Sequence, residues 1–195
     1  MTSGAATRLA WGLGLCVLGA NVVIKPAPTL TDVRRASDGV RRSREWRGRS
    51  VPAFDLPLLD GQVFRANPPA GHPMTVLVFF TTWCEVCAPE LSEIQQFVER
   101  LHADGQPLRV VGIDVQEEAQ VVRRFAKQHD LTLPMGVDGS GDVMRAYDVR
   151  TFPTTVVVGE DGRARLFHEG PVANADVVLD PVVGGQRRPH TGSRP

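Results

Sequence analysis

Cysteine is scarce in this sequence. The chain has three cysteines among 195 residues, too few for a small fold that disulfides hold together. The 19 glycines and 15 prolines follow no period, which excludes collagen and favours flexible flanks, and no internal repeat is visible. With 42% hydrophobic residues, this length suits one globular domain of ordinary size with some chain left over.

Net charge is also absent, because 22 Lys and Arg balance 22 Asp and Glu. The balance conceals an asymmetry along the chain. Residues 51–185 hold 10 basic and 19 acidic side chains, whereas the two flanks together hold 12 basic and 3 acidic ones. The sequence therefore predicts an acidic domain with basic flanks.

No apolar run reaches the roughly 17 to 25 residues that usually span a bilayer. Residues 9–24 form an uncharged apolar segment of 16 residues. We interpret this segment as an uncleaved N-terminal membrane anchor; the alternatives are the core of a cleaved signal peptide and a buried helix of the domain. Six basic residues follow it between positions 25 and 44, and only Arg8 precedes it. By the positive-inside rule, this distribution would place the domain in the cytoplasm.

The chain divides into four segments by composition. We expect a signal-anchor segment over 1–24, a basic linker over 25–50, a folded domain over 51–183 and a disordered tail over 184–195. The linker is rich in Arg and Ser and has little apolar periodicity, so it is expected to be solvated. Its alternative is a polybasic stretch that lies on anionic headgroups.

Strand and helix patterns alternate within the domain. Continuous runs of β-forming apolar residues predict two buried strands, and apolar spacings of three and four predict two amphipathic helices. A short segment, a short helix, a hairpin and a truncated last helix follow. The ranges, in chain order, are 75–80, 89–103, 108–115, 117–129, 133–137, 141–147, 154–158 with 163–168, and 175–179. This order predicts an α/β fold with a central sheet and helices packed on it.

Two cysteines stand between the first buried strand and the helix that follows it, as Trp83-Cys84-Glu85-Val86-Cys87. A helix start favours a thiolate through its free backbone N–H groups and its dipole. Thiol-disulfide exchange needs one attacking thiolate and a second nearby thiol, which makes Cys84 the candidate attacker and Cys87 the resolver. Half of a zinc site and a purely structural disulfide are the alternatives that we favour less.

Phe152-Pro153-Thr154 directly precedes a predicted strand, where proline is otherwise disfavoured. A cis Pro153 would resolve this conflict. The backbone before such a proline can pair with an incoming peptide as an added strand. Taken alone, this tripeptide is also compatible with an ordinary trans turn.

Together, WCEVC, TFPTTVVVGEDGR and the earlier VPAFDLPLLDGQVF resemble the thioredoxin-like TlpA/ResA family. Its members are bacterial membrane-anchored thiol-disulfide oxidoreductases, CcmG/DsbE-like, within the AhpC/TSA-redoxin superfamily. The resemblance covers about residues 51–172. It implies a thioredoxin-like fold, with a mixed β-sheet flanked by helices, tethered to the outer face of the cytoplasmic membrane.

The resemblance also implies roles for single residues. Cys84 would be the nucleophile, Cys87 the resolving thiol and Pro153 the cis proline. Glu90 matches a family acid near the disulfide that shuttles protons or tunes the thiols. The residues expected to contact the substrate are Trp83, Phe152 and Thr154.

We therefore expect a reductase of protein disulfides outside the cytoplasm, in cytochrome c maturation or a related maturation. The redox-active disulfide would need no cofactor and no metal, and an upstream membrane electron donor would reduce it again. We expect membrane attachment through 9–24, no nucleic-acid partner and a monomer. Glu85 lies between the cysteines and opposes thiolate formation by like charge, which favours a reductant over a strong oxidant.

Three alternatives remain open. Thr81-x-x-Cys84 imitates the Thr-x-x-Cys of peroxiredoxin-type peroxidases, but Leu77 replaces the proline expected four residues before the threonine. A relative resembling MauD, a maturation factor for a periplasmic amine dehydrogenase, is an alternative within the family. A non-catalytic thioredoxin-fold binding module is the third.

Overall fold

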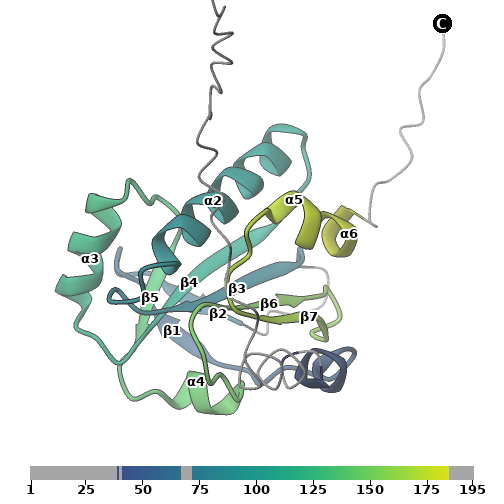
Figure 1. Cartoon of the computed structure of the whole chain (residues 1–195), viewed down its shortest axis with the longest axis horizontal. Coiled ribbons are helices and arrows are strands. Elements are labelled where there is room, and N and C mark those ends of the chain that lie inside the picture. The colour runs from purple at the N-terminus through teal and green to yellow at the C-terminus, as the bar shows by residue number, and fades with distance from the viewer. Residues whose placement is uncertain (1–38, 40, 67–71, 185–195) are drawn as a thin grey trace, which may run out of the picture.

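The computed structural model of the chain describes residues 39, 41–66 and 72–184 (Figure 1). The predicted anchor over 9–24, most of the predicted linker and the tail beyond Gly184 lie outside the described residues. Over the described ranges, no helix has both the length and the apolar character needed to cross a membrane.

A five-stranded sheet forms the centre of the domain, in the order β5-β4-β3-β6-β7. The three strands β3, β4 and β5 run parallel, whereas β6 is antiparallel to β3 and β7 is antiparallel to β6. The mixed sheet expected from the sequence is therefore confirmed. The strands are β3 (Thr75–Phe80), β4 (Arg109–Val115), β5 (Met135–Asp138), β6 (Thr154–Val158) and β7 (Ala164–Glu169).

The middle strand, β3, is buried on both faces, as its continuous apolar sequence predicts. Alternate side chains enter two separate apolar clusters: Val78 and Phe80 lie in one, and Leu77 and Phe79 in the other. A strand anchored on both sides is a rigid support. Its carboxyl end leads directly into residues 81–87, which carry both cysteines and which we call the cysteine segment.

Helices cover one face of the sheet, which we call the redox face (Figure 1). These helices are α2 (Cys87–Ala103), α3 (Ala119–Gln128), α5 (Ala175–Val178) and α6 (Asp180–Val183). Leu91, Ile94 and Phe97 of α2 are fully or almost fully buried in the cluster beneath. Their spacing of three residues places them on one side of the helix. The last helix is interrupted at Leu179, just before Pro181, in agreement with the truncation expected from the sequence.

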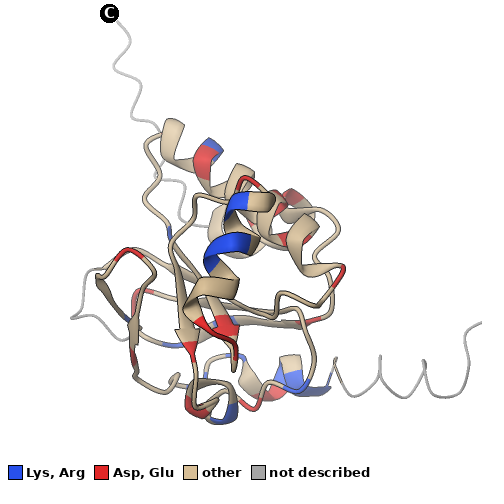
Figure 2. Cartoon of the chain, turned by 90° about the vertical axis from the view of Figure 1, so that its left-hand side faces the viewer, with Lys and Arg blue, Asp and Glu red and all other residues tan. Residues whose placement is uncertain are grey.

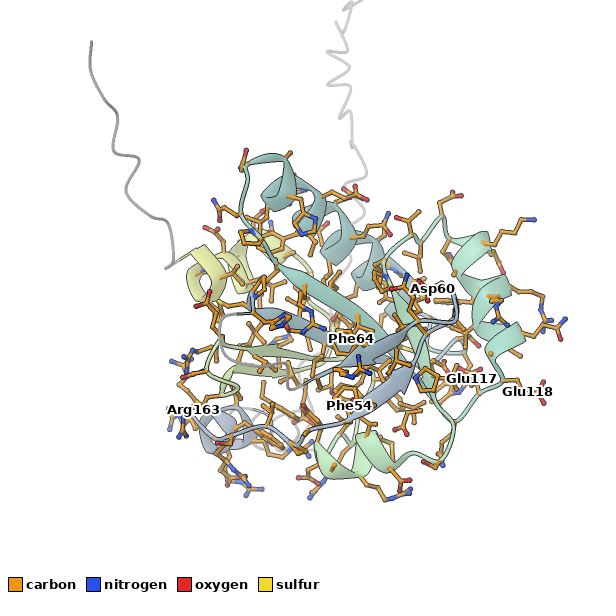
Figure 3. The ribbon with its side chains drawn as sticks, turned by 180° about the vertical axis from the view of Figure 1, so that it is seen from behind. Phe54, Asp60, Phe64, Glu117, Glu118 and Arg163 are labelled. Atoms are coloured by element: carbon orange, nitrogen blue, oxygen red, sulfur yellow. A yellow bond between two sulfur atoms is a disulfide. The ribbon has the colours of Figure 1, made fainter. Side chains whose placement is uncertain are left out.

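The opposite face is covered by the N-terminal part of the domain, and we call it the covered face. A helical segment over 41–46, a hairpin of β1 (Asp55–Pro57) and β2 (Val63–Arg65), and helix α4 (Asp142–Ala146) lie there. Figure 3 views this side, with Phe54 and Phe64 labelled at the hairpin. The Phe64 ring is buried, and the Arg109 guanidinium lies 4.5 Å from its centroid.

The structure corrects the expected start of the domain at residue 51, because residues 41–50 belong to the folded unit. Trp46 is only 5% exposed and stacks on Tyr147 and Phe167, with ring centroids 5.7 and 5.3 Å apart. Ser50 forms a β-bridge with Arg163. The solvated linker therefore cannot extend to residue 50.

Arg42 explains why composition was misleading in this segment. Its side chain is buried, forms an ion pair with Glu169 and donates from Nη1 to the Asp148 carbonyl at 2.8 Å. Arg42 and Trp46 are four residues apart, so they share one side of the helical segment. Arg41 and Arg44 are exposed. The arginine-rich sequence of this segment therefore gave no indication that Arg42 and Trp46 face the interior.

Figure 2 colours the ribbon by charge, and the positions of basic and acidic residues are interspersed along the elements on this side of the domain. Helix α3 faces the viewer there, with the basic residues Arg123, Arg124 and Lys127 along its length. Glu117 and Glu118 precede its first turn. Acids at the start and bases further along complement the helix dipole.

Candidate redox site

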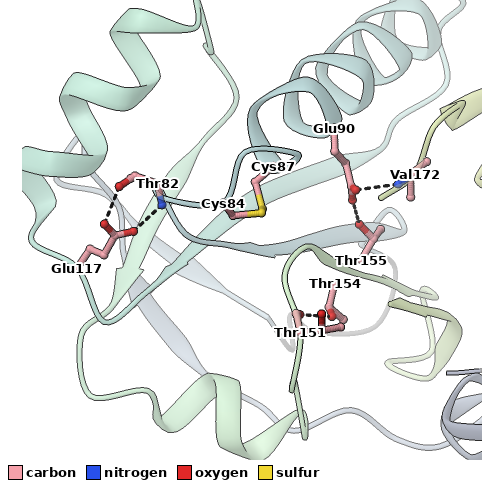
Figure 4. The surroundings of a disulfide bond; sticks show 9 residues. All are labelled: Thr82, Cys84, Cys87, Glu90, Glu117, Thr151, Thr154, Thr155 and Val172. Atoms are coloured by element: carbon pink, nitrogen blue, oxygen red, sulfur yellow. Dashed lines mark hydrogen bonds between the residues drawn. A yellow bond between two sulfur atoms is a disulfide. The ribbon is translucent and has the colours of Figure 1, made fainter. Parts of the chain in front are cut away.

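Cys84 and Cys87 form a disulfide at the carboxyl end of β3, where α2 begins (Figure 4). Their Cα atoms are 5.4 Å apart, within the usual range for a disulfide. Cys84 is partly exposed, whereas Cys87 is fully buried as the first residue of α2. An incoming thiol or disulfide therefore has access to Cys84, and Cys87 is shielded by the domain.

Exposed apolar residues flank the partly exposed Cys84. Trp83 is 70% exposed, and Val86 is also exposed. The Trp83 ring meets the Phe152 ring edge to face, with centroids 6.1 Å apart. This contact joins the cysteine segment to the loop before β6. Trp83 and Phe152 are thus brought together beside the disulfide, and their contact with a substrate stays a prediction.

The Phe152-Pro153 peptide bond is cis, as the sequence led us to expect. The Pro153 carbonyl accepts a hydrogen bond from Gly170 N–H at 2.9 Å. Thr154 is fully buried, and its Oγ1 donates to the Thr151 carbonyl at 2.8 Å (Figure 4). The Thr154 hydroxyl therefore binds within the loop, and contact of Thr154 with a substrate stays a prediction.

Glu90 lies one helical turn after Cys87, on the buried side of α2. Its Oε1 accepts a hydrogen bond from Thr155 Oγ1 at 2.6 Å, and its Oε2 accepts one from Val172 N–H at 2.8 Å (Figure 4). Burial raises the pKa of Glu90 above its usual value, while the two hydrogen bonds oppose that shift. The carboxyl group therefore joins α2 to β6 and to the segment before α5.

A second group of acids near the cysteine segment was not recognised from the sequence. The Glu117 carboxylate accepts hydrogen bonds from Thr82 N–H at 2.5 Å and from Thr82 Oγ1 at 2.6 Å (Figure 4). Thr82 stands two residues before Cys84, so Glu117 fixes the start of the cysteine segment. Asp114, on β4, is fully buried near Glu117. The available signal was a lone acid inside the apolar run LRVVGIDV.

The geometry supports chemistry of the cysteine pair itself. Over the described ranges, no three His, Cys, Asp or Glu side chains are grouped as metal ligands. The two sulfurs are bonded to each other, one of them accessible, beside a cis proline. A thioredoxin fold with such a pair defines the class of thiol-disulfide exchange proteins.

The chain belongs to the AhpC/TSA family, which it matches over residues 47–166. It is 33% identical over 125 residues to sporulation thiol-disulfide oxidoreductase A of Bacillus subtilis, covering 63% of this chain and 74% of that protein. It is 27% identical to thiol-disulfide oxidoreductase ResA of Bacillus thuringiensis, covering 60% and 65%. These matches confirm the TlpA/ResA-like thioredoxin-fold assignment.

The fold also matches a solved structure of a secreted Mycobacterium tuberculosis disulfide oxidoreductase homologous to Escherichia coli DsbE. The TM-score is 0.56 at 25% identity, and the match covers 68% of this chain and 95% of the other. The thioredoxin-like fold is thereby confirmed.

Proposed function

We propose that this protein is a thiol-disulfide oxidoreductase that reduces disulfides in other proteins through Cys84 and Cys87. The observation that carries the proposal is the asymmetry of the pair: one sulfur is accessible, the other is buried, and both stand at the junction of β3 and α2. The similarity to proteins named thiol-disulfide oxidoreductases supports it.

The reaction starts from the reduced pair. The Cys84 thiolate attacks one sulfur of a substrate disulfide, which forms a mixed disulfide and releases the other substrate sulfur as a thiolate. Cys87 then loses its proton and attacks Cys84 Sγ. The substrate leaves as a dithiol with two electrons gained, and the protein is left with the Cys84–Cys87 disulfide seen in the structure.

Glu90 is our candidate for the proton acceptor from Cys87. It shares the buried side of α2 with Cys87 and keeps its raised pKa in an apolar environment. A carboxyl group whose pKa moves toward neutrality exchanges protons with a thiol more readily than an ordinary glutamate. Trp83 and Phe152 would contact the substrate chain beside the disulfide.

We further propose that residues 9–24 anchor the protein and that the domain works outside the cytoplasm. The apolar segment and the family resemblance support this location, whereas the basic residues after the segment oppose it. The linker would then lie near anionic headgroups, and a membrane electron donor would reduce the disulfide again. Cytochrome c maturation is one role that fits this location.

Insulin reduction tests the activity. The purified domain from residue 39 onward, kept reduced by dithiothreitol, should accelerate the precipitation of insulin chains. Cys84→Ala should abolish the acceleration, and Val177→Ala, at an exposed position of α5, serves as a control that keeps both thiols. Equal acceleration by Cys84→Ala would refute the proposal. Peroxide consumption that survives the loss of Cys87 would establish the peroxidase instead.

An alkaline phosphatase fusion tests the location. Alkaline phosphatase needs disulfides and is active only outside the cytoplasm, so a fusion after residue 38 should be active. An inactive fusion with an intact, expressed chain would place the domain inside. The cysteine chemistry would stand in either case.

A further inference from the structure

Asp114 is a buried acid whose carboxylate oxygens are poorly supplied with hydrogen bonds. It lies near the carboxyl end of β4, opposite Phe80 of β3 and Val137 of β5, and it is fully buried. Neither of its carboxylate oxygens has a hydrogen-bond partner at full hydrogen-bond geometry, and the Glu117 backbone N–H is the donor near enough to lower its pKa, as the smallest of the influences on it. A buried carboxylate with so little donation is costly, so the group must obtain a better partner or keep a proton.

The neighbouring charged group is another acid. Glu117 interacts with Asp114, and its own two oxygens already accept hydrogen bonds from Thr82 N–H and Thr82 Oγ1. Two carboxylates have no donor to share unless one of them is protonated. A proton on Asp114 supplies that donor and leaves Glu117 as the charged acceptor for Thr82.

We propose that Asp114 and Glu117 form a carboxyl pair that holds one proton, with Asp114 as its protonated member, and that this pair positions Thr82 and the Cys84 segment. Asp114 is thus a positioning residue that acts through Glu117. When the pair loses its proton to solvent, two adjacent carboxylates repel each other. The hold of Glu117 on Thr82 then weakens, and the cysteine segment loosens.

Burial is the main cause that raises the pKa of Asp114, to about 8; the Glu117 carboxyl group adds to the shift, and a hydrogen bond from the Glu117 backbone N–H opposes it. Strand β3 carries no charged side chain. The other charged groups on the surrounding elements are bonded elsewhere or exposed. Asp138 Oδ2 accepts from Met144 N–H, Glu90 is held by Thr155 and Val172, and the exposed groups are Glu85, Glu118, Arg123, Arg124 and Lys127.

The amide proton of Thr82 reports directly on the pair, because a hydrogen bond to a carboxylate displaces its NMR resonance. The experiment uses the oxidised domain from residue 39, in which Cys84 and Cys87 do not titrate. We expect the Thr82 resonance to shift with a midpoint near pH 8. In Asp114→Asn this step should vanish, because the Asn amide donates to Glu117 without titrating. In Glu90→Gln it should persist.

Two results would overturn the proposal. One is a Thr82 resonance that stays constant through this pH range in the unmodified protein. The other is the same step in Asp114→Asn, which would assign it to another group. Glu117→Gln is a second variant: it removes the like charge and offers Asp114 an amide donor, so the step should move to lower pH. An unchanged midpoint in that variant would contradict the pairing of Asp114 with Glu117.

The activity measurement rests on the proposed function, whereas the NMR measurement does not. We expect the ratio of insulin reduction at pH 9 to that at pH 7 to be about threefold higher in Asp114→Asn than in the unmodified protein, the size expected for one weakened hydrogen bond. Equal ratios in the two proteins would contradict an influence of the Asp114–Glu117 pair on insulin reduction. If the unmodified protein reduced no insulin but still showed the Thr82 step, that result would count against the proposed function and not against the Asp114–Glu117 pair.

Discussion

The two faces of the sheet use the same residue types for different purposes, and the two described tryptophans show this most clearly. Trp83 on the redox face is 70% exposed beside Cys84, and Trp46 on the covered face is 5% exposed between two other rings. A reactive disulfide must leave room for a second chain, so its surroundings cannot all be buried. Both faces have a buried apolar cluster, but Trp83 lies outside the cluster of the redox face, whereas Trp46 belongs to the cluster of the covered face. Stability and reactivity are therefore expected to respond to different substitutions.

The largest effect on stability is expected at Trp46. Trp46→Ala should lower the free energy of unfolding by about 3–5 kcal/mol, because it removes a large buried ring from the aromatic stack. Urea denaturation measures the loss. Trp83→Ala is the matched control and should stay within about 0.5 kcal/mol, since its ring is mostly in solvent. Equal losses in the two variants would contradict the division between the faces.

Arg42 provides the second test of the covered face. Arg42→Met should cost about 3 kcal/mol, because it leaves Glu169 buried without its cation. The double variant Arg42→Met/Glu169→Leu removes both charges and should recover most of the loss. A double variant as unstable as Arg42→Met would show that the loss of stability comes from the packing of the Arg42 side chain and not from the uncompensated charge of Glu169. Insulin reduction at a temperature where all variants are folded should change little.

Asp114 makes the stability of the redox face depend on pH. Its pKa is raised to about 8 in the folded chain, so the folded state binds its proton more tightly than the unfolded state. This contribution is fully present below the unfolded pKa of about 3.9 and is lost as the pH rises through about 8.

The free energy of unfolding should accordingly fall by up to about 1.4 kcal/mol per pH unit through this range. Glu90 adds to the fall with the same sign, because burial raises its pKa too. Urea denaturation at pH 5, 7 and 9 should show a flatter dependence in Asp114→Asn. Parallel pH profiles for the two proteins would rule out this role of Asp114.

The smallest effect is expected at Glu85, an exposed acid between the two cysteines. Its charge disfavours the Cys84 thiolate by less than about 1 kcal/mol, because water screens the interaction. Glu85→Gln should therefore raise the rate of Cys84 alkylation in the reduced protein by about two- to threefold at low salt. Added salt should reduce the difference. An unchanged or slower rate would mean that Glu85 does not set the reactivity of the thiol.

Local patterns were sufficient to predict most of the redox face. The run over 75–80 and the apolar spacing over 89–103 predicted β3 and α2, and the cysteines between them needed only their position in that order. The hairpin of β6 and β7, with its turn at Glu160, was also predicted. These signals are local, since they depend on residues close together in the sequence.

The covered face was predicted poorly because its contacts are distant in sequence. Trp46 finds its partners about a hundred residues further along the chain, and no local pattern indicates that contact. Strands β1 and β2 have three residues each, too few for an alternating pattern to be recognised. The Asp114–Glu117 pair was missed for a related reason: the acids are visible in the sequence, but the burial of Asp114 and its lack of a well-aligned donor depend on the packed fold.

The central claim is that Cys84 is the attacking sulfur and Cys87 the resolving one. Intact-mass spectrometry tests it directly. The measurement uses reduced variants that keep only one cysteine of the pair, mixed with an excess of a disulfide-containing peptide. Cys87→Ser should accumulate a mixed disulfide through the accessible Cys84. Cys84→Ser should form it far more slowly, because Cys87 is buried. Equal or faster trapping through Cys87 would contradict the assignment.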